Sequence, residues 1–303
     1  MRNTKLWIAV LWVFVVLLGL ARLADSLFSL SLIIPLTLVA AVFALIHGAI
    51  RYRWSGVLSF LAICLVVSNI FENTSILTGF PFGHYHYTGS PKLFLVPLFI
   101  GPSYFATAYL AWMLAIVVVG DIRREGSWFT TIVVPLIASA FMVMWDLTFD
   151  PTASTVQHLW IWEQGGGYFG VPITNYLGWF FTVYIFLQLF ALFLRFRKAA
   201  HKGAPPLPRS FYAQAIVMYA QLGLMAVLTY LVSSGNTLVT DASGVVWQTR
   251  SIAEAEATVS IFTIVVVAAL SAVKLIQAST DVPNTSVEAR TAGTATKRAG
   301  MAA

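Results

Sequence analysis

Long apolar runs separated by short polar segments dominate the pattern of this chain. The first run, Leu6–Ala21, is compatible with a signal-peptide segment, but its unbroken length and the runs that follow favour a transmembrane helix. Seven further runs are expected to cross a bilayer, which takes about 20 residues; they cover about residues 27–50, 54–72, 93–120, 128–149, 175–194, 211–232 and 257–273. The pattern predicts an all-α, polytopic membrane helical bundle of about eight transmembrane helices. In the fourth of these eight spans, Pro97 and the pair Gly101–Pro102 predict a kink or a break.

The composition agrees with a membrane protein. Hydrophobic residues make up 59% of the 303 positions and charged residues only 10%, whereas soluble domains have about 25% charged residues. The bundle is expected to occupy residues 1–278, and the tail at 279–303, rich in Ala, Thr and Ser, is expected to be disordered. The net charge of +6 does not indicate nucleic-acid binding, because the basic residues lie in short segments between spans.

The distribution of Lys and Arg predicts how the bundle is oriented. Most of them lie near the two termini or in three short segments: 51–53, 123–124 and 195–209. The other side has only three: Arg22, Lys92 and Arg250. Because positive charge gathers on the cytoplasmic side, both termini are expected in the cytoplasm, with the protein in the cytoplasmic membrane. Two unusual loops, at 73–92 and 150–174, then lie together on the opposite face.

Two carboxylates stand at the end of an apolar run. Asp146 and Asp150 follow a stretch, Phe129–Trp145, that carries no charge, and a carboxylate near hydrocarbon costs about 2.5–3.5 kcal/mol. In a continuous helix, residues four apart share one face, but Pro151 predicts that the helix stops there. The acids are either interfacial residues at a helix end or groups held for chemistry, and the aromatic loop that follows favours chemistry.

The first unusual loop follows Glu72 and Asn69, which predict a polar helix end, and contains the alternating run His84–Tyr87. In an extended strand this alternation places imidazoles on one side and phenols on the other. Three interpretations stay open: a metal site completed by the acids, an interfacial aromatic belt, and a lid over a site for a long apolar substrate. A metal site is the least favoured, because His-x-His alone supplies too few ligands.

The second unusual loop is rich in aromatic residues and glycine. The loop contains Trp160, Trp162 and Tyr168, and Trp179 follows shortly after it. These aromatic residues either form an interfacial belt or provide π faces that stabilise a cation. The run Gly165–Gly170 lacks the Gly-Lys-Ser/Thr of a phosphate loop and predicts a tight turn instead. Asn175 opens the next span, where its simplest role is that of helix N-cap.

These residues fall into four motifs: Asn69-x-x-Glu72-x-x-Ser75, Gly79-Phe-Pro-Phe-Gly-x-Tyr85-x-Tyr87, Trp145-Asp-x-x-x-Asp150-Pro, and Trp160-x-Trp162 followed by Gly167-Tyr-Phe-Gly-Val-Pro-x-x-Asn175-Tyr-x-Gly-Trp179. As a set they resemble the integral-membrane carotenoid biosynthesis proteins, which include the carotenoid 1,2-hydratases and the bisanhydrobacterioruberin hydratases. The resemblance is strong over about residues 51–190 and rests on hydropathy elsewhere. It implies addition of water across the terminal double bond of a linear carotenoid end group, which gives a tertiary alcohol.

Hydration of such an alkene passes through a tertiary carbocation and needs a proton donor in a dry site. A carboxyl group in apolar surroundings can stay protonated near neutral pH, more so beside a second carboxylate. The expected catalytic residues are Asp146, Asp150 and Glu72, with a slight preference for Asp150 as donor, since Pro151 can turn its carboxyl group toward the pocket. The expected substrate-binding residues are Asn69, Phe82, His84, Tyr85, His86, Tyr87, Trp160, Trp162, Tyr168, Asn175 and Trp179.

No metal or other cofactor is expected. The carotenoid is expected to enter sideways from the lipid bilayer, and association with other carotenoid enzymes is a further expectation. The main alternative is a carotenoid end-group cyclase or isomerase, in which the same cation loses a proton instead of gaining water. The alternative from another class is a proton-coupled transporter or ion channel, which the grouping of the acids at one face and the lack of a visible inverted repeat disfavour.

Overall fold

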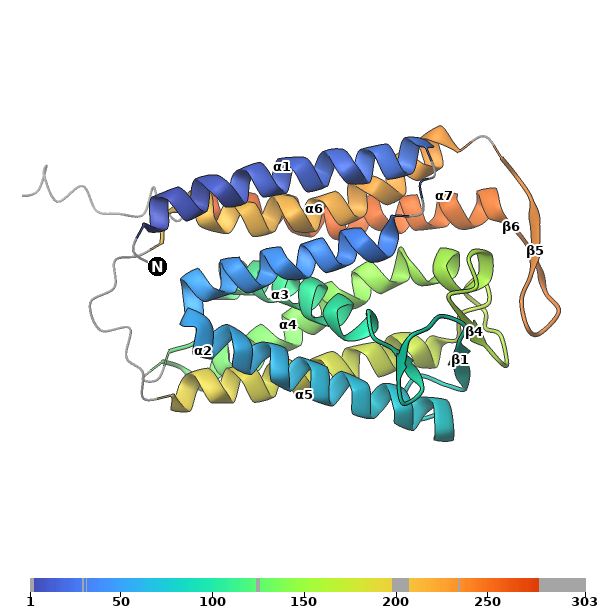
Figure 1. The fold of residues 1–303 in the computed structure, drawn as a ribbon, viewed down its shortest axis with the longest axis horizontal. Coiled ribbons are helices and arrows are strands. Elements are labelled where there is room, and N and C mark those ends of the chain that lie inside the picture. Colours follow the sequence, from blue (N-terminus) through green and yellow to red (C-terminus); the bar gives the residue numbers. More distant parts are fainter. Residues whose placement is uncertain are drawn as a thin grey trace, which may run out of the picture.

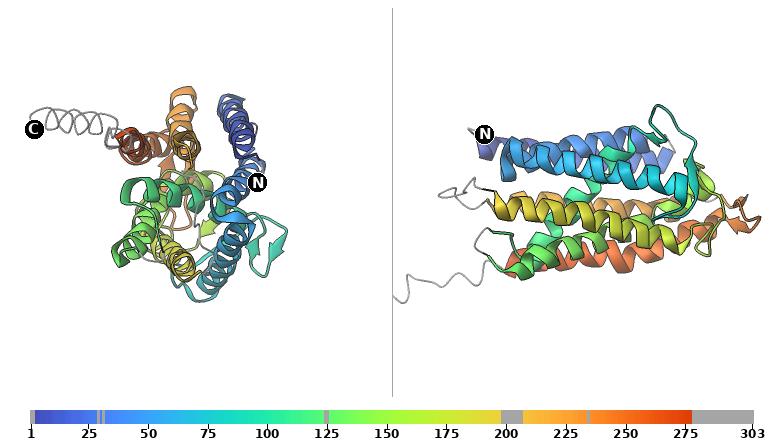
Figure 2. Two further views of the ribbon diagram at one scale, coloured as in Figure 1. Left: turned by 90° about the vertical axis from the view of Figure 1, so that its left-hand side faces the viewer. Right: turned by 90° about the horizontal axis from the view of Figure 1, so that it is seen from below.

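The computed structural model describes residues 3–28, 30, 32–123, 126–197, 207–233 and 235–277. Within these residues the helices lie side by side along one long axis (Figure 1, Figure 2). The long helices are α1 (Thr4–Phe28), α2 (Ile33–Thr78), α3 (Ile100–Val119), α4 (Trp128–Leu147), α5 (Ile173–Phe196) and α6 (Arg209–Val232). The last span consists of α7 (Thr249–Ser260), a short π-helical segment (Ile261–Val265) and α8 (Val266–Gln277). The tail expected at 279–303 lies outside the described residues.

Seven helical spans of the described chain are long and apolar enough to cross a membrane, which confirms the predicted polytopic bundle. The sequence pattern predicts about eight, and the difference lies in α2, whose 46 residues form two helical segments joined at Arg53. There a φ of 61° and a ψ of 168° leave the helical region, and the chain reverses its direction (Figure 1). The number of membrane crossings stays a prediction.

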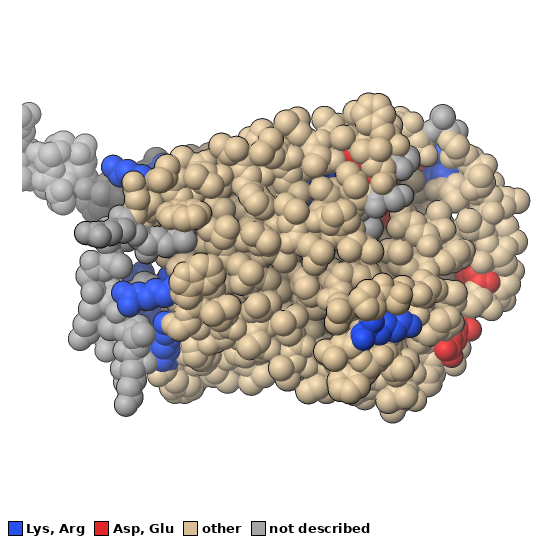
Figure 3. All heavy atoms as spheres, in the orientation of Figure 1, with Lys and Arg blue, Asp and Glu red and all other residues tan. Residues whose placement is uncertain are grey.

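The centre of the bundle is α3, which is apolar all round. Every residue from Tyr104 to Ile116 is buried, as expected of a helix surrounded by others. The outer helices point large apolar side chains outward, and Leu177 and Phe262 are 63% and 73% exposed. In Figure 3 the charged side chains of the visible face gather toward the two ends and leave an uncharged band between them. Such a band suits lipid rather than water.

Short antiparallel strands close one end of the bundle (Figure 1). The strand β1 (Tyr85–Tyr87) pairs with β4 (Trp160–Trp162), and this pairing joins the two loops that the sequence predicts to lie together. It also confirms the predicted alternation, because Tyr85 and Tyr87 are buried whereas His86 is exposed. The other pairs are β2 (Lys92–Leu93) with β3 (Val96–Pro97), and β5 (Leu238–Thr240) with β6 (Val246–Gln248).

The glycine-rich run forms the tight turn that the sequence predicts. Gly165 and Gly170 have positive φ values of 62° and 86°, which glycine adopts without a steric penalty. A Cβ atom on Gly166 would lie 2.1 Å from the carbonyl carbon of Val171, so only glycine fits there. The turn leads directly into α5 and fixes where that helix begins.

Two helix boundaries near the loops differ from the sequence-based expectation. α2 continues to Thr78, so Glu72 lies inside the helix rather than at its end. α3 begins only at Ile100, because Pro97 belongs to β3 and the pair Gly101–Pro102 lies in the first helical turn. A proline in the first turn removes no helical hydrogen bond, and the expected kink or break in this span is therefore wrong.

The helix that carries the acids also ends differently. α4 ends at Leu147, two residues form a turn, and Pro151–Val156 then form a π-helical segment, η1. Pro151 thus begins a helical segment instead of stopping one, since proline fits the first helical position. The last span begins at Thr249 rather than near Ala257, which places Glu256 inside a helix.

Candidate active site

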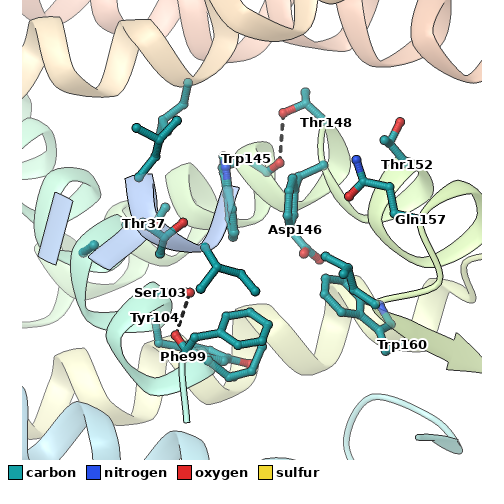
Figure 4. Close-up of a pocket in the computed structure, with 18 of the residues that line it drawn as sticks. Thr37, Phe99, Ser103, Tyr104, Trp145, Asp146, Thr148, Thr152, Gln157 and Trp160 are labelled. Carbon is teal, nitrogen blue, oxygen red and sulfur yellow. Dashed lines mark hydrogen bonds between the residues drawn. The ribbon is translucent and has the colours of Figure 1, made fainter. Parts of the chain in front are cut away.

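A cavity of about 290 Å³ lies between the helices and the β1–β4 pair. Its volume is just below the range for sites that enclose a drug-sized ligand, about 300–1,000 Å³. Figure 4 shows part of its wall, with side chains that converge from several elements. Of the site residues that the sequence predicts, these line the cavity: Glu72, Phe82, Tyr85, Tyr87, Asp146, Trp160, Trp162, Asn175 and Trp179.

The two aspartates form one hydrogen-bonded unit with an amide. The Nδ2 atom of Asn175 donates to Oδ2 of Asp146 at 2.9 Å and to Oδ2 of Asp150 at 2.6 Å. All three side chains are only 1% exposed. Because the amide group carries two N–H bonds, one side chain can orient both carboxyl groups at once.

Local structure explains how this unit forms. Asp146 lies in the last turn of α4, and the following turn carries the chain to Asp150 at the start of η1. Asn175 lies in the first turn of α5, whose N-cap is Pro172. The expected N-cap role of Asn175 is therefore wrong. Its amide reaches across to the end of α4 instead, which ties α5 to the two acids.

The two aspartates differ in how they face the cavity. Asp150 accepts the indole N–H of Trp160 at 2.7 Å and that of Trp162 at 3.4 Å on its Oδ1, and it does not line the cavity. Both of its oxygens are thus engaged by N–H donors. Asp146 does line the cavity, and its Oδ1 has no hydrogen-bond partner among the described residues. The accessible carboxyl oxygen of this unit therefore belongs to Asp146.

Glu72 forms a second buried unit, with three phenols. The hydroxyl of Tyr87 donates to Oε2 at 2.9 Å, that of Tyr104 donates to Oε1 at 2.6 Å, and that of Tyr85 also donates to Oε2. Tyr85 and Tyr87 lie on the buried face of β1, and Tyr104 lies near the start of α3. Burial and then the neighbouring Glu72 carboxylate raise the pKa of Tyr85 and Tyr87 well above the usual value, so both phenols remain donors.

Aromatic rings form much of the cavity wall. Trp179 stacks on Tyr104 with ring centroids 4.2 Å apart, and Trp145 meets Trp179 edge-on at 6.0 Å. Tyr85 packs against Trp162 with centroids 4.8 Å apart. Such rings keep water away from the wall and present π faces that attract a cation.

A second part of the wall connects the cavity to the outside of the bundle. Apolar side chains from α2, α3 and α6 line it: Leu36, Ala40, Ala106, Leu110, Leu222, Met225 and Ala226. Arg22 and Asp25 of α1 also border this part. Ile34 and Thr229 belong to the wall as well and are exposed, so the cavity reaches the bundle surface between these helices.

Four of the predicted substrate-binding residues do not line the cavity: Asn69, His84, His86 and Tyr168. Asn69 accepts a hydrogen bond from Asn73 at 3.1 Å within α2. His86 points outward and lies 3.4 Å from the exposed Glu163. Tyr168 donates to the carbonyl of Leu147 at 3.2 Å, and burial raises its pKa to about 12. The contacts of Asn69, His86 and Tyr168 therefore lie outside the cavity.

The placement of the histidines bears on the metal interpretation. In the described part of the chain, no three side chains of His, Cys, Asp or Glu are grouped so as to hold a metal ion. His86 lies on the exposed face of β1, whereas Glu72 and the two aspartates are buried. Strand alternation therefore separates this imidazole from the acids.

Several cavity residues escape the sequence reasoning, among them Tyr104 and Glu256. Both lie where the expected helix boundary is wrong: α3 begins later than expected, and α7 begins earlier. A start of α3 at Ile100 places Tyr104 in its second turn, beside the loops. An acid immediately before an apolar run, as at Glu256, is the signal available in the sequence.

Comparison with known proteins adds two findings. Residues 28–241 match the family model described as "Carotenoid biosynthesis protein". The chain is also 30% identical over 163 residues to the bisanhydrobacterioruberin hydratase of Haloarcula japonica, a match that covers 53% of this chain and 51% of that relative. The aligned region thus spans about half the length of the relative. No solved structure matches the chain significantly.

Proposed function

Because the chain belongs to the family of carotenoid biosynthesis proteins, we propose that it adds water across the terminal double bond of a linear carotenoid end group and forms a tertiary alcohol. The observation that carries this proposal is the Asp146 carboxyl group, which is buried, lines an aromatic cavity and has one oxygen without a partner among the described residues. The name of the similar hydratase points the same way.

In the first step, Asp146 acts as the general acid. Its O–H bond breaks, the π electrons of the alkene form a new C–H bond at the second carbon, and a tertiary cation remains at the first carbon. The resulting carboxylate keeps the N–H of Asn175 at 2.9 Å, and a hydrogen bond to the charged form stabilises it. Asp150 holds the other N–H of the same amide, so it fixes the geometry of the donor.

The cavity wall protects the cation that forms. Each aromatic face contributes about 0.5–2 kcal/mol to the binding of a cation, and Trp145, Trp160 and Trp179 all line the cavity. The hydroxyls of three tyrosines donate to the Glu72 carboxyl oxygens, and in its carboxylate form Glu72 attracts the cation from another side of the wall.

Capture by water completes the reaction. The oxygen of a water molecule forms a C–O bond with the cation, and one water proton passes to the Asp146 carboxylate, which restores the acid. The net change is the addition of one water to one end group. Side chains of this chain supply every group that this sequence of steps needs, so the proposal includes no cofactor.

The shape of the cavity suggests how the substrate binds. About 290 Å³ suits an end group rather than a whole carotenoid, and the apolar wall between α2, α3 and α6 provides a path for the polyene toward the bilayer.

We place the protein in the cytoplasmic membrane with both termini in the cytoplasm, where other enzymes of the pathway are potential neighbours. A reporter fused after Arg53 should be cytoplasmic and one inserted near Gly89 external; the reverse result contradicts this orientation.

Pigment analysis tests the proposed reaction. The chain is expressed in bacteria that make lycopene or γ-carotene, and the carotenoids are separated and weighed by mass spectrometry. Hydration adds one water per reacted end group, whereas cyclisation or isomerisation leaves the mass unchanged. Products of unchanged mass support the cyclase or isomerase, and unaltered pigments at normal protein level contradict any end-group chemistry on these substrates.

A further inference from the structure

Glu256 is a buried carboxylate that the proposed steps do not use. It lies in α7, is 6% exposed and lines the same cavity as Asp146. It also lies beyond residues 28–241, the part of the chain that matches the family model. A carboxylate inside a membrane bundle is costly to keep, which calls for a role.

Glu256 belongs to a polar wall of the cavity. Its Oε1 accepts the backbone N–H of Thr152 at 2.9 Å, and its Oε2 accepts the hydroxyl of Thr152 at 2.7 Å. Thr148 and Gln157 line the cavity beside Thr152, on the side where Asp146 and Trp160 lie (Figure 4). We call Thr148, Thr152, Gln157 and Glu256 the polar wall. Gln157 is exposed and Thr148 is buried, so this wall leads from the surface toward Asp146.

We propose that the polar wall binds the water molecule that is captured by the carotenoid cation, with Glu256 as its hydrogen-bond acceptor. This inference rests on the proposed hydration. The position of the polar wall favours it, because Thr148 and Thr152 line the same cavity as Asp146 and lie on its side of that cavity. A carboxylate has about four acceptor sites, and Thr152 occupies two of those on Glu256. The others are available for a water molecule in the cavity.

The bonds in this step balance without a further reactant. The water oxygen forms the C–O bond, one of its protons passes to the Asp146 carboxylate, and its other proton becomes the hydroxyl proton of the alcohol. Glu256 accepts a hydrogen bond from that second proton and ends the step unchanged. It therefore orients a lone pair of the water toward the cation and lowers the chance that the cation loses a proton first.

A purely structural role predicts something else. Glu256 contacts the first turn of η1, which follows Asp150, and a side chain that only caps this turn acts on the position of the acids. Its loss then slows protonation and hydration equally. Glu256→Gln separates the two roles, because the amide oxygen still accepts the N–H of Thr152 while the other carboxyl oxygen, an acceptor for water, is replaced by an NH₂ donor.

Reaction in D₂O measures the two steps separately. Membranes that contain the full chain are incubated with lycopene or γ-carotene, and mass spectrometry follows hydrated product and deuterium on carbon in unhydrated carotenoid. For Glu256→Gln we expect that unhydrated carotenoid still gains deuterium on carbon. The amount of hydrated product, divided by the amount of this deuterated but unhydrated carotenoid, should fall about tenfold to a hundredfold. Glu254→Gln is the matched control, because Glu254 is exposed on the same helix, and it should keep the wild-type ratio.

Each other outcome is decisive. If hydration and deuterium incorporation fall equally in Glu256→Gln, the side chain has a purely structural role and the inference is overturned. A ratio of hydrated product to deuterated, unhydrated carotenoid equal to that of the wild type also overturns it. If that variant does not fold, Thr152→Val removes one hydroxyl of the polar wall at similar volume; it should lower the ratio several-fold, and an unchanged ratio overturns the inference. A wild-type protein that neither hydrates nor deuterates these carotenoids contradicts the proposed function itself.

Discussion

Two buried carboxyl units line one cavity, and they differ in what surrounds them. Asp146 and Asp150 share the amide of Asn175, whereas Glu72 accepts the hydroxyls of three tyrosines. The phenols engage both oxygens of Glu72, which favours a fixed carboxylate. Asp146 keeps one oxygen without a partner among the described residues.

The hydrogen-bond donors around a carboxyl group decide which role that group can take. A carboxyl group whose oxygens are all engaged by donors has no geometry for giving a proton to carbon. It is suited to electrostatic stabilisation of positive charge instead. The same reasoning separates Asp146 from Asp150, since N–H donors engage both oxygens of Asp150. We therefore assign proton donation to Asp146, where the sequence alone slightly favours Asp150.

The largest expected effect comes from Asp146→Asn. The amide oxygen can keep the hydrogen bond from Asn175, and the amide nitrogen occupies the place of the free oxygen, so the fold should persist. An amide cannot protonate carbon, and we expect hydration to fall about 10²–10⁴-fold. The measurement is hydrated carotenoid per amount of membrane-inserted protein. Glu163→Gln, an exposed change of the same kind, is the control, and a near wild-type rate in Asp146→Asn refutes the assignment.

Asp150→Asn should have the next largest effect. Asp150 holds Asn175 and the two indoles in place, and a hydrogen bond to a charged group contributes about 1.5–3 kcal/mol. We expect a loss of about tenfold to a hundredfold, because the donor is then held less well. Hydration rates of the two Asn variants, compared at equal protein level, check the order. A greater loss in Asp150→Asn than in Asp146→Asn reverses the assignment of the donor.

Glu72→Gln tests the other unit. It removes the anion but keeps an oxygen that accepts from the phenols, and we expect about a tenfold loss of hydration, less than for the aspartates. Tyr104→Phe removes one donor and keeps the ring that stacks on Trp179, so its loss should be only a few-fold. If Glu72→Gln is as inactive as Asp146→Asn, then Glu72 takes part in proton transfer and the two units do not differ as described.

The smallest effects are expected at the two histidines of the first loop. His84 and His86 do not line the cavity. We therefore expect His84→Ala and His86→Ala to lower the hydration rate only about twofold, which corresponds to about 0.5 kcal/mol in the activation free energy. Treatment with EDTA should leave hydration intact, and the purified protein should hold no stoichiometric metal. If EDTA abolishes activity and added iron or zinc restores it, the cofactor-free chemistry proposed for both carboxyl units is overturned.

The fold class was accessible from the sequence because it depends on local properties. Uncharged runs of bilayer length define the spans whatever the rest of the chain does. The alternation at 84–87 is also local, since successive side chains of a strand point to opposite faces. It predicted that the phenols of Tyr85 and Tyr87 lie on the same side of the strand, and the structure shows that this side is the buried one. The glycine-rich turn at 165–170 followed from the same kind of reasoning.

The packing of the helices determines which acid faces the cavity and which side chains hold it. Asn175 bonds to acids 29 and 25 residues away, and Glu256 bonds to Thr152 across 104 residues. Misplaced helix starts hid Tyr104 and Glu256, because α3 begins at Ile100 and α7 at Thr249, which places Tyr104 in the second turn of α3 beside the loops and Glu256 inside a helix. The order of spans and loops along the chain was enough to show which residue types lie near one end of the bundle. Their pairing depends on contacts between helices that are distant in the chain, and those contacts exist only once the bundle has packed.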